Sequence, residues 1–435
     1  MKLEERQNIY ANAVSRMIQI ETIHHPQGDG DKFFRFQSLL AELVPHVFTT
    51  CEKWTFDGSL LLRWKGKNPN RAVILMSHQD VVEAPGKWKY PPFSGTIAEG
   101  KIWGRGALDI KGNLYCILRA VEELMQEGFE PACDVYIASS HEEETGGNDY
   151  IVDFLRGRGV QPEFLVDEGG GIKPCPVPGS DRYFAVISIA EKGNITMKCT
   201  ARGRGGHASH PGRWTPLPRL GAFMAAFEED GIFTVKMNKA CEAAFRKLAM
   251  TIEDPTQAAY LLSLANEEPG WKETLTDQLR SMMRTTIAFT MAHGSETYNV
   301  LPQEAYVICN SRVALGETVT ETVNKIREVA GRYQVEVEVL HADEPTPVVD
   351  PNGEAFRRVE KAIQTVWPGM DVIPFLLEGA TDTKHYVPIC PNCIRFSCLK
   401  ADASQRSRAH GIDENIDVAA LPKGIEIFKA LIREL

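Results

Sequence analysis

Three short apolar runs in the chain each end in a group of acidic and imidazole side chains. The runs are AVILM at 72 to 76, DVYIAS at 134 to 139 and EFLV at 163 to 166. Polar turns bound these runs, and stretches with helical periodicity separate them, a pattern that favours a buried, largely parallel sheet flanked by helices. In such an α/β fold, ligands bind outside the carboxyl ends of the strands. The polar groups that follow the runs are therefore expected to converge.

The converging side chains have the chemistry of a metal site. They are His78 and Asp80 after the first run, His141, Glu142, Glu143 and Glu144 after the second, and Asp167 and Glu168 after the third. A further acid, Asp109, follows the glycine-rich GRGALD turn and opens a helix at 110 to 127. Burying several carboxylates together without compensation is costly, so either they hold cations or they do not converge.

Imidazole and carboxylate ligands without thiolates suit zinc, cobalt or manganese. Two ions about 3.5 to 4 Å apart would need one bridging carboxylate, and their shared water would become a hydroxide near neutral pH. A carboxylate that is free of metal would then serve as the general base. This pattern therefore predicts a hydrolytic site.

Two simpler interpretations apply to the motifs when each is taken alone. The pair His78 and Asp80 could be a capped strand end, and the three glutamates at 142 to 144 could be the exposed start of a helix. The occurrence of HxD, GRGxxD, EEETGG and VDEGG in one order favours the metal site. A structural zinc on Cys390 and Cys393 would lack a second cysteine pair.

Length and periodicity indicate more than one domain in the 435 residues. After Lys192 the pattern changes to a β-α-β-β-α-β order, with a helical insertion at about 239 to 283. We expect residues 1 to 192 and 344 to 435 to form a catalytic domain. Residues 193 to 343 would then be an inserted, smaller α+β domain of ferredoxin-like type, acting as a lid or dimerisation domain.

Composition excludes several classes of partner. The formal net charge is -10, and no basic cluster offers a surface for nucleic acid. No apolar run approaches the ~20 residues needed to span a bilayer, and the start, MKLEERQNIY, lacks the apolar core of a signal peptide. We therefore expect a cytoplasmic protein without a membrane partner. The ten cysteines are too dilute for a disulfide scaffold, so reduced thiols are expected.

Eight segments resemble, in order, the signature of the M20 metallopeptidase family. They are SHQDVV, GRGALDIKG, HEEETGG, VDEGG, GRGGHAS, NVLP, GATDTKHY and AHGIDENI. The family includes aminoacylases, carboxypeptidases, deacetylases and desuccinylases. The resemblance implies a hydrolase with two divalent metal ions, most simply zinc, that cleaves a peptide or amide bond next to a free carboxylate. Deacylation of N-acyl amino acids or ureides is the alternative, and a metal-binding protein without catalysis is a remote one.

By this resemblance, His78 binds one metal ion, Asp80 orients His78, and Asp109 bridges both ions. The string HEEETGG places Glu143 on the general base and Glu144 on a metal ligand. A shift by one residue would make Glu142 the base, but the two glycines that follow favour the first register.

The resemblance leaves one ligand open and assigns another. Asp167 and Glu168 are both eligible in VDEGG, and only one of two successive residues in a strand can face the crevice. The last ligand should be His410, which matches the family better than His385. His385 is expected to pack or to contact substrate.

The second domain is expected to contribute His207, Asn299 and Arg312. The histidine of GRGGHAS matches one that stabilises the oxyanion in the family, often from the partner subunit of a homodimer. Asn299 and Arg312 match positions near the substrate, and a guanidinium can fork a carboxylate, although a strand salt bridge is an equal interpretation for Arg312. Asp382 is expected near the small-molecule substrate.

Overall fold

The structure is a computed structural model that describes residues 2–174, 182–228 and 231–435. The chain forms two compact units. The first contains residues 1–189, 349–375 and 381–435, and the second contains residues 190–348 and 376–380.

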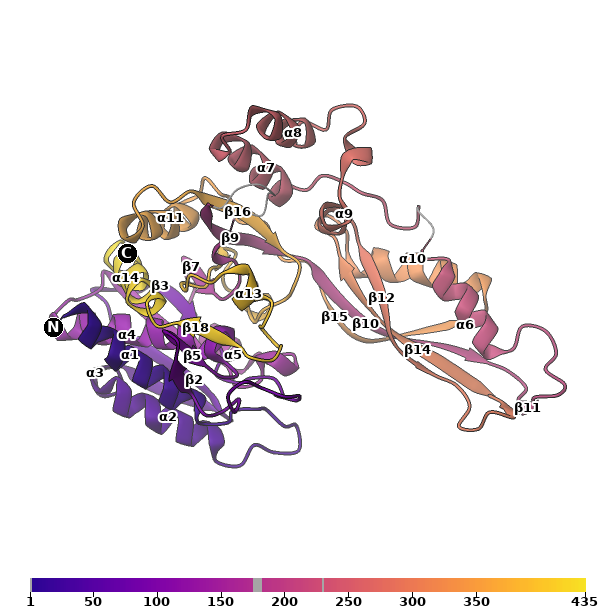
Figure 1. Ribbon diagram of the computed structural model, residues 1–435, viewed down its shortest axis with the longest axis horizontal. Coiled ribbons are helices and arrows are strands. Elements are labelled where there is room, and N and C mark those ends of the chain that lie inside the picture. The colour runs from indigo at the N-terminus through magenta and orange to yellow at the C-terminus, as the bar shows by residue number, and fades with distance from the viewer. Residues whose placement is uncertain (1, 175–181, 229–230) are drawn as a thin grey trace. The chain divides into compact units, whose positions relative to one another are not determined.

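The first unit is built on a mixed sheet with the order β1-β2-β6-β3-β7-β17-β9-β16, in which β8 also pairs with β9 (Figure 1). Its strands are β1 (Glu52–Phe56), β2 (Ser59–Trp64), β3 (Asn68–Met76), β6 (Cys133–Ser139), β7 (Phe164–Asp167), β8 (Gly171–Pro174), β9 (Tyr183–Glu191), β16 (Val372–Leu377) and β17 (Cys393–Arg395). The central strands β6, β3, β7 and β17 run parallel, whereas β1 with β2, β2 with β6, and β17 with β9 are antiparallel pairs. The α/β class and the parallel pairing of the three apolar runs are thus confirmed.

Helices cover both faces of this sheet. They include α1 (Leu3–Ile18), α2 (Lys32–Leu43), α3 (Pro45–Thr50), α4 (Gly112–Gln126), α5 (Tyr150–Gly157), α11 (Glu354–Val366), α12 (Thr383–Tyr386) and α14 (Ala420–Arg433). On one side, α4 packs against α14, α1 and α3. On the other, Ile74 of β3 packs in one cluster with Val152 and Leu155 of α5. Because both faces are covered, the last five residues of β3 are all apolar and buried, as in a buried parallel strand.

Some elements of this unit have no counterpart in the sequence analysis. Helix α2 and the hairpin of β1 and β2 fill residues 32 to 64. Strand β17 is only three residues long, yet it pairs in parallel with β7. It brings the C-terminal part of the chain to the centre of the sheet, next to the strand that leads into Asp167 and Glu168.

The second unit contains a four-stranded antiparallel sheet with the order β12-β14-β10-β15. The strands are β10 (Gly193–Arg202), β12 (Thr286–His293), β14 (Glu304–Val313) and β15 (Glu336–Asp343), and the short strands β11 (Gly206–His207) and β13 (Val300–Leu301) pair separately. Helices α6 (Pro216–Ala225) and α10 (Val319–Arg332) pack against the sheet. The helical stretch near 239 to 283 consists of α7 (Lys239–Thr251), α8 (Pro255–Ala265) and α9 (Asp277–Met283).

One helix differs from its expected position. The segment GAFMAAFEE suggests a helix over 221 to 229, but α6 begins at Pro216 and ends at Ala225. Proline is favoured in the first turn of a helix because its fixed backbone angle suits that position and its missing N–H needs no partner there. Residues 229 and 230 lie outside the described part of the chain.

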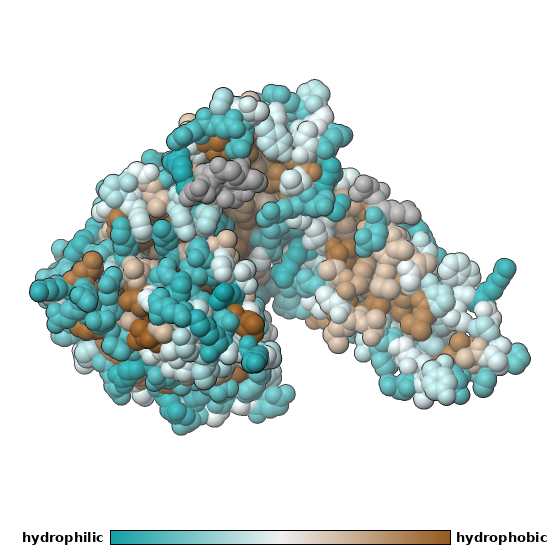
Figure 2. Space-filling view, in the orientation of Figure 1, coloured by the Kyte–Doolittle hydropathy of each residue, from teal (hydrophilic) through white to brown (hydrophobic). Residues whose placement is uncertain are grey.

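Hydrophilic side chains cover much of the visible face of the first unit, whereas apolar side chains gather over β12 and its neighbours in the second (Figure 2). Among the described residues, no helix is long and apolar enough to cross a bilayer. The nine cysteines in the described ranges are buried, and Cys175 lies outside those ranges.

Candidate metal centre

His78 follows the end of β3 and is oriented by Asp80. Its ring is buried, and Nδ1 lies 3.0 Å from the Asp80 carbonyl oxygen and 3.3 Å from Asp80 Oδ1. The opposite nitrogen, Nε2, lies 3.3 Å from both Asp109 Oδ1 and Glu168 Oε1. An acceptor behind the ring selects the tautomer that presents the other nitrogen to a metal ion.

Asp109 lies between two groups of ligand atoms. Asp109 is in the turn before α4. Its Oδ1 atom faces His78, and its Oδ2 atom lies 3.2 Å from Nε2 of His410. His410 Nε2 is also 3.0 Å from Glu144 Oε2. One carboxylate thus has an oxygen in each of two groups, and each group contains one imidazole and one glutamate.

The turn that carries Asp109 is held by a buried ion pair between Glu414 and Arg105. The Glu414 carboxylate accepts hydrogen bonds from three backbone N–H groups of the GRGALD turn at 2.8 to 3.1 Å, including that of Asp109. It also accepts one from Arg105 Nη1 at 2.7 Å. Arg105 Nη2 donates to the carbonyl oxygen of Gly411, next to His410. Arg105 lies in the segment GRGALDIKG and Glu414 in AHGIDENI, but no role was predicted for either residue.

We expect Glu414→Gln to lower the free energy of unfolding by about 3–5 kcal/mol, because it leaves the buried Arg105 guanidinium without its counter-charge. Burial and Asp109 raise the pKa of Glu414 to about 7, against the opposing effect of Arg105, so denaturant unfolding should be measured at pH 8, where the carboxylate is charged. Glu99→Gln is the matched control, since Glu99 pairs with Lys89 at the surface and its loss should leave the free energy of unfolding nearly unchanged. Equal losses in the two variants would contradict the structural role of Glu414.

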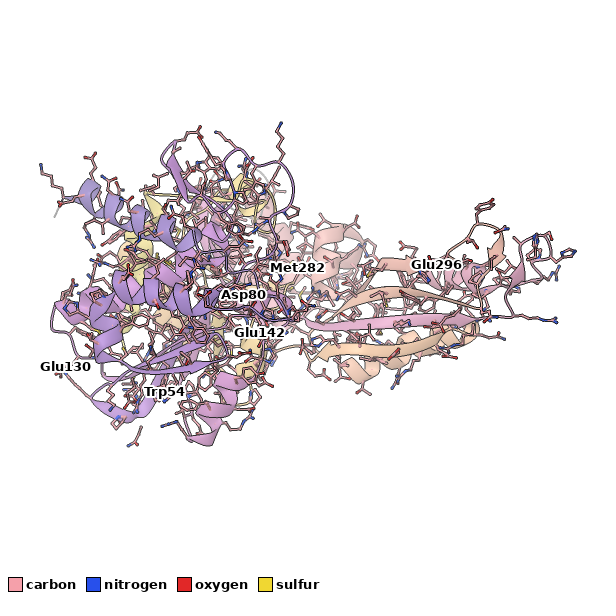
Figure 3. The ribbon with its side chains drawn as sticks, turned by 90° about the horizontal axis from the view of Figure 1, so that it is seen from below. Trp54, Asp80, Glu130, Glu142, Met282 and Glu296 are labelled. Carbon is pink, nitrogen blue, oxygen red and sulfur yellow. The ribbon has the colours of Figure 1, made fainter. Side chains whose placement is uncertain are left out.

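The acidic string after β6 is anchored by Asp80. The Asp80 carboxylate accepts hydrogen bonds from the backbone N–H groups of Glu143 at 3.3 Å and Glu144 at 3.0 Å. The two following side chains diverge, since Glu144 reaches His410 and Glu143 Oε2 lies 3.9 Å from Nε2 of His78. Asp80 and the neighbouring Glu142 lie in the same region of the first unit (Figure 3). Asp80 therefore positions the imidazole and the acidic turn together.

Gly147 in this turn leaves room for the side chain of Asp382. A Cβ added at Gly147, whose φ is 69°, would lie 2.3 Å from Asp382 Oδ1. Asp382 is buried close to the acids, and this burial raises its pKa. His385 lies in the next helical turn, where Nδ1 is 2.7 Å from Asp149 and Nε2 is 3.2 Å from the carbonyl oxygen of Gly146.

The structure distinguishes between the two acids of VDEGG. Glu168 joins His78 and Asp109, whereas Asp167 is the last residue of β7 and belongs to none of the ligand groups in the described residues. Of the two alternatives, the geometry thus brings Glu168 and not Asp167 into a ligand group. Successive side chains of a strand point to opposite faces, so only one of the pair can reach the crevice.

Four groups of described residues could hold a metal ion. They are His78, Asp109 and Glu168; His78, Glu143 and Glu144; Asp109, Glu144 and His410; and His24, His141 and Glu142. Each supplies ligand atoms within 4.8 Å of one another. Nitrogen and oxygen donors of this kind fit zinc, cobalt or manganese. Within the described ranges, neither a cysteine nor His385 belongs to such a group, and the last expected imidazole, His410, does.

The pKa shifts indicate an excess of negative charge in this crevice. Burial raises the pKa of Glu143 well above its ordinary value, and Glu168 and Asp382 add to the effect. Burial and Asp109 raise the pKa of Glu168 to about 7, while His78 opposes them. Hydrogen bonds to Asp109 and Glu144 raise the pKa of His410 to about 10. Without cations, these groups reduce the negative charge by holding protons. Bound cations would neutralise the same charge instead.

The three residues expected from the second domain lie in the second unit. His207 is exposed on β11, with Nδ1 2.8 Å from the Ser209 hydroxyl. Asn299 is exposed in the turn before β13, and its carbonyl oxygen accepts a hydrogen bond from the Ala208 N–H. Arg312 is partly buried on β14, and burial lowers its pKa. They are not members of the ligand groups, all of which lie in the first unit.

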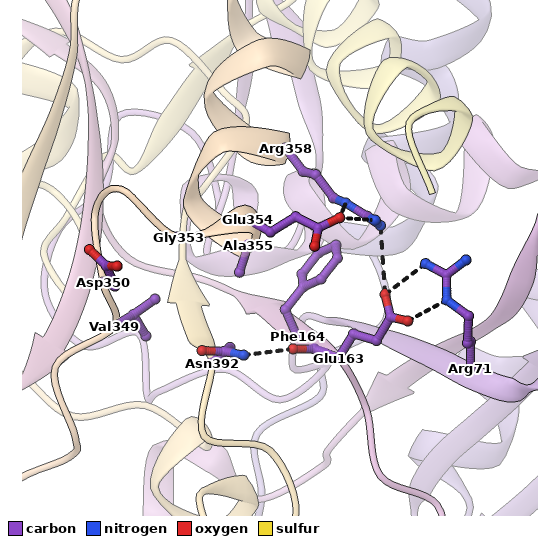
Figure 4. A pocket seen from close by; sticks show the side chains of 10 residues that line it. All are labelled: Arg71, Glu163, Phe164, Val349, Asp350, Gly353, Glu354, Ala355, Arg358 and Asn392. Atoms are coloured by element: carbon purple, nitrogen blue, oxygen red, sulfur yellow. Dashed lines mark hydrogen bonds and ion pairs between the residues drawn. The ribbon is translucent and has the colours of Figure 1, made fainter.

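A pocket at the amino ends of β3 and β7 offers a contrast to this site (Figure 4). Four of its five charged side chains pair with one another, since Glu163 contacts both Arg71 and Arg358, and Arg358 contacts Glu354. The fifth, Asp350, accepts a hydrogen bond from the backbone N–H of Asn352. Ligands of parallel sheets bind at the carboxyl ends instead. Most of the charge in this pocket is therefore already neutralised by ion pairs within its lining.

Comparison with known proteins decides the family. The model of peptidase family M20/M25/M40 matches residues 74–434. The chain belongs to this family. It is 30% identical over 423 residues to the probable carboxypeptidase S-like 2 of Dictyostelium discoideum, covering 92% of this chain and 79% of the relative. It is 29% identical to the N-fatty-acyl-amino acid synthase/hydrolase PM20D1 of Mus musculus, covering 95% of this chain and 85% of the relative.

Solved structures agree with the M20 fold. The M20 family metallo-carboxypeptidase Sso-CP2 from Sulfolobus solfataricus has a TM-score of 0.75 at 17% identity, covering 98% of both chains. Human carnosine dipeptidase 1 has a TM-score of 0.70 at 16% identity, covering 99% of this chain and 96% of the other. Membership of M20, a family of metal-dependent hydrolases, is therefore supported by sequence and by fold.

Proposed function

We propose that this M20 protein is a metal-dependent hydrolase that cleaves a peptide or amide bond next to a free carboxylate, as a dipeptidase or carboxypeptidase does. The observation that carries the proposal is the placement of Asp109, whose two oxygens lie 3.3 Å from Nε2 of His78 and 3.2 Å from Nε2 of His410. A shared carboxylate of this kind is what a pair of divalent ions requires. We expect zinc, with cobalt or manganese as substitutes.

The ligand groups define where the two ions would be held. His78 and Glu168 would hold one ion, Glu144 and His410 the other, and Asp109 both. When bound, such ions supply positive charge that polarises the scissile carbonyl group and favours the ionisation of water. Asp80 keeps Nε2 of His78 directed toward its ion by accepting the hydrogen bond of Nδ1.

Glu143 is the proposed general base. Its carboxylate takes a proton from the attacking water and returns it to the nitrogen of the leaving amine. Its backbone is anchored by Asp80, and its side chain is nearly buried beside His78. Bulk water therefore competes little for the proton during the transfer.

The names of the relatives support two substrate classes. The carboxypeptidase S-like relative supports a peptide substrate, and the PM20D1 relative, which is named for N-fatty-acyl amino acids, supports an N-acyl amino acid. Both classes place a free carboxylate beside the scissile amide. We propose that Arg312, Asn299 and Asp382 contact the substrate. The Arg312 guanidinium would form a bidentate pair with the free carboxylate.

A matched substrate panel tests this function. We expect the metal-loaded protein to hydrolyse at least some dipeptides or N-acyl amino acids, and to lose activity when the free carboxylate is replaced by an amide. Removing one partner of a charge-assisted pair costs about 2–5 kcal/mol, so kcat/KM should fall by at least about 30-fold. Release of free amine measures both rates. Equal rates on acids and amides would contradict carboxylate recognition, and no hydrolysis of any substrate would favour the binding-protein alternative.

His207 is the proposed oxyanion-stabilising residue. It is exposed, and within the described ranges its Nε2 has no hydrogen-bond partner. We expect His207→Ala to lower kcat by about 10²–10³ because the loss of one oxyanion donor has that effect. His210→Ala is the matched control, since His210 also contacts Ser209 but is not assigned to the reaction. Similar turnover in both variants would remove this role.

We further propose that the chain forms a homodimer through its second unit and that His207 acts on the partner's substrate. The outer strands of the four-stranded sheet expose apolar residues, with Met291 62% exposed on β12 and Leu340 51% exposed on β15. Exposed strand edges of this kind favour pairing with another chain. Mixing the inactive variants Glu143→Gln and His207→Ala should then restore part of the turnover, because one site in each mixed dimer has both residues intact. The proposal would be contradicted if mixed dimers form but turnover is not restored.

A further inference from the structure

A second cluster of ligand atoms lies outside the groups that share Asp109. One atom from each of His24, His141 and Glu142 lies within 4.8 Å of the others. The proposed hydrolysis uses none of these three residues. We propose that they bind a third divalent cation of the zinc or cobalt type, separate from the pair held by Asp109.

His24 is oriented as a metal-binding imidazole. Its Nδ1 lies 2.7 Å from Asp29 Oδ2, so that Nε2 faces Glu142, whose Oε2 is 3.7 Å away. Asp29 is fixed in turn by the backbone N–H of His25 at 2.8 Å and by Lys32 Nζ at 3.2 Å. A carboxylate behind the imidazole is the usual outer partner of a histidine ligand, because it sets the tautomer and raises the basicity of the other nitrogen.

His141 is held just as closely from the opposite side. Its Nδ1 lies 2.9 Å from the Ser59 hydroxyl, which leaves Nε2 for a ligand. Its ring is buried and stands edge-on to His24 and Phe33, with centroid distances of 5.3 and 5.1 Å. A Cβ at Gly58 would lie 2.6 Å from Cδ2 of this ring, so only glycine leaves room for it. The packing thus fixes the ring before any ion binds.

The spacing of the cluster suits an ion better than a direct bond. The 3.7 Å between His24 Nε2 and Glu142 Oε2 exceeds the usual length of a hydrogen bond. Zinc bonds of about 2 Å in a tetrahedron separate neighbouring ligand atoms by about 3.3 Å. The side chains of His24 and Glu142 are 11% and 20% exposed, so water screens them little while leaving access for a fourth, water ligand. Two imidazoles and one carboxylate are a donor set that zinc and cobalt accept.

Counting bound ions tests the third site. The wild-type chain is stripped with a chelator, reloaded with Co²⁺ or Zn²⁺, freed of loose metal by gel filtration and subjected to elemental analysis. We expect a third equivalent per chain in addition to the catalytic pair. His24→Asn should bind one ion fewer, and the matched control His25→Asn should bind the wild-type number, because the His25 side chain is exposed and lies outside the cluster.

A second variant and a rate measurement identify which ion is lost. His141→Gln should lose the same equivalent as His24→Asn, and the double variant should lose no more. Turnover of the loaded His24→Asn chain should fall by no more than the about 10–100-fold that the loss of an outer partner costs, because none of the three residues acts in the proposed hydrolysis. Two or fewer ions on the wild-type chain, or an unchanged count in His24→Asn, would overturn the third site without affecting the hydrolase proposal. Parallel loss of one ion and all turnover would also overturn it, because that ion would belong to the catalytic pair.

Discussion

Replacement of Glu143 by glutamine is expected to abolish hydrolysis while the bound metal stays in place. Glutamine preserves the size of the side chain and its backbone anchor on Asp80, but its amide cannot take a proton from water. General base catalysis contributes about 10²–10⁴ to a rate, so kcat should fall by at least that factor. Steady-state kinetics and elemental analysis of the same sample measure the two properties together.

Two neighbouring glutamates serve as controls for this result. Glu144→Gln should lose metal together with activity, because Glu144 lies 3.0 Å from His410 in a ligand group. Glu142→Gln should reduce turnover far less than Glu143→Gln, since Glu142 faces His24 rather than His78. A larger loss in Glu142→Gln would shift the register of HEEETGG by one residue and make Glu142 the base.

Removal of the metal by a chelator is expected to abolish activity and to lower the unfolding temperature. Without cations, the carboxylates of Asp109, Glu144 and Glu168 repel one another in a crevice with little water. An ion that binds only the folded chain stabilises it by about 4 kcal/mol when its free concentration is 1,000 times its Kd. Calorimetry before and after chelation measures the loss, and added zinc, cobalt or manganese should restore both stability and turnover.

Asp109→Asn provides a sharper version of the same test. Because Asp109 belongs to both ligand groups, this single change should weaken binding of both ions, whereas His410→Ala should weaken mainly one. The number of ions retained per chain separates the two variants. Full activity of a chain shown to hold no metal would refute the proposed mechanism.

Local sequence patterns were sufficient for the elements that lead into the ligand groups. The apolar runs at β3, β6 and β7 are buried without interruption, and α4 lies within the helix expected at 110 to 127. The failures are local. Helix α6 starts at Pro216 because proline suits the first turn of a helix, and β17 is too short to show any period.

The chemical types in the crevice could be predicted from residue order, since imidazoles and acids that directly follow buried strands must gather at one edge of a parallel sheet. The packing of the elements settled the remaining questions. It placed Glu168 rather than Asp167 beside His78, because that choice depends on which face of the strand is turned inward. It also paired Glu414 with Arg105 across 309 positions and brought His24 to His141. Such contacts arise only when separate elements pack, and no local pattern of residues records them.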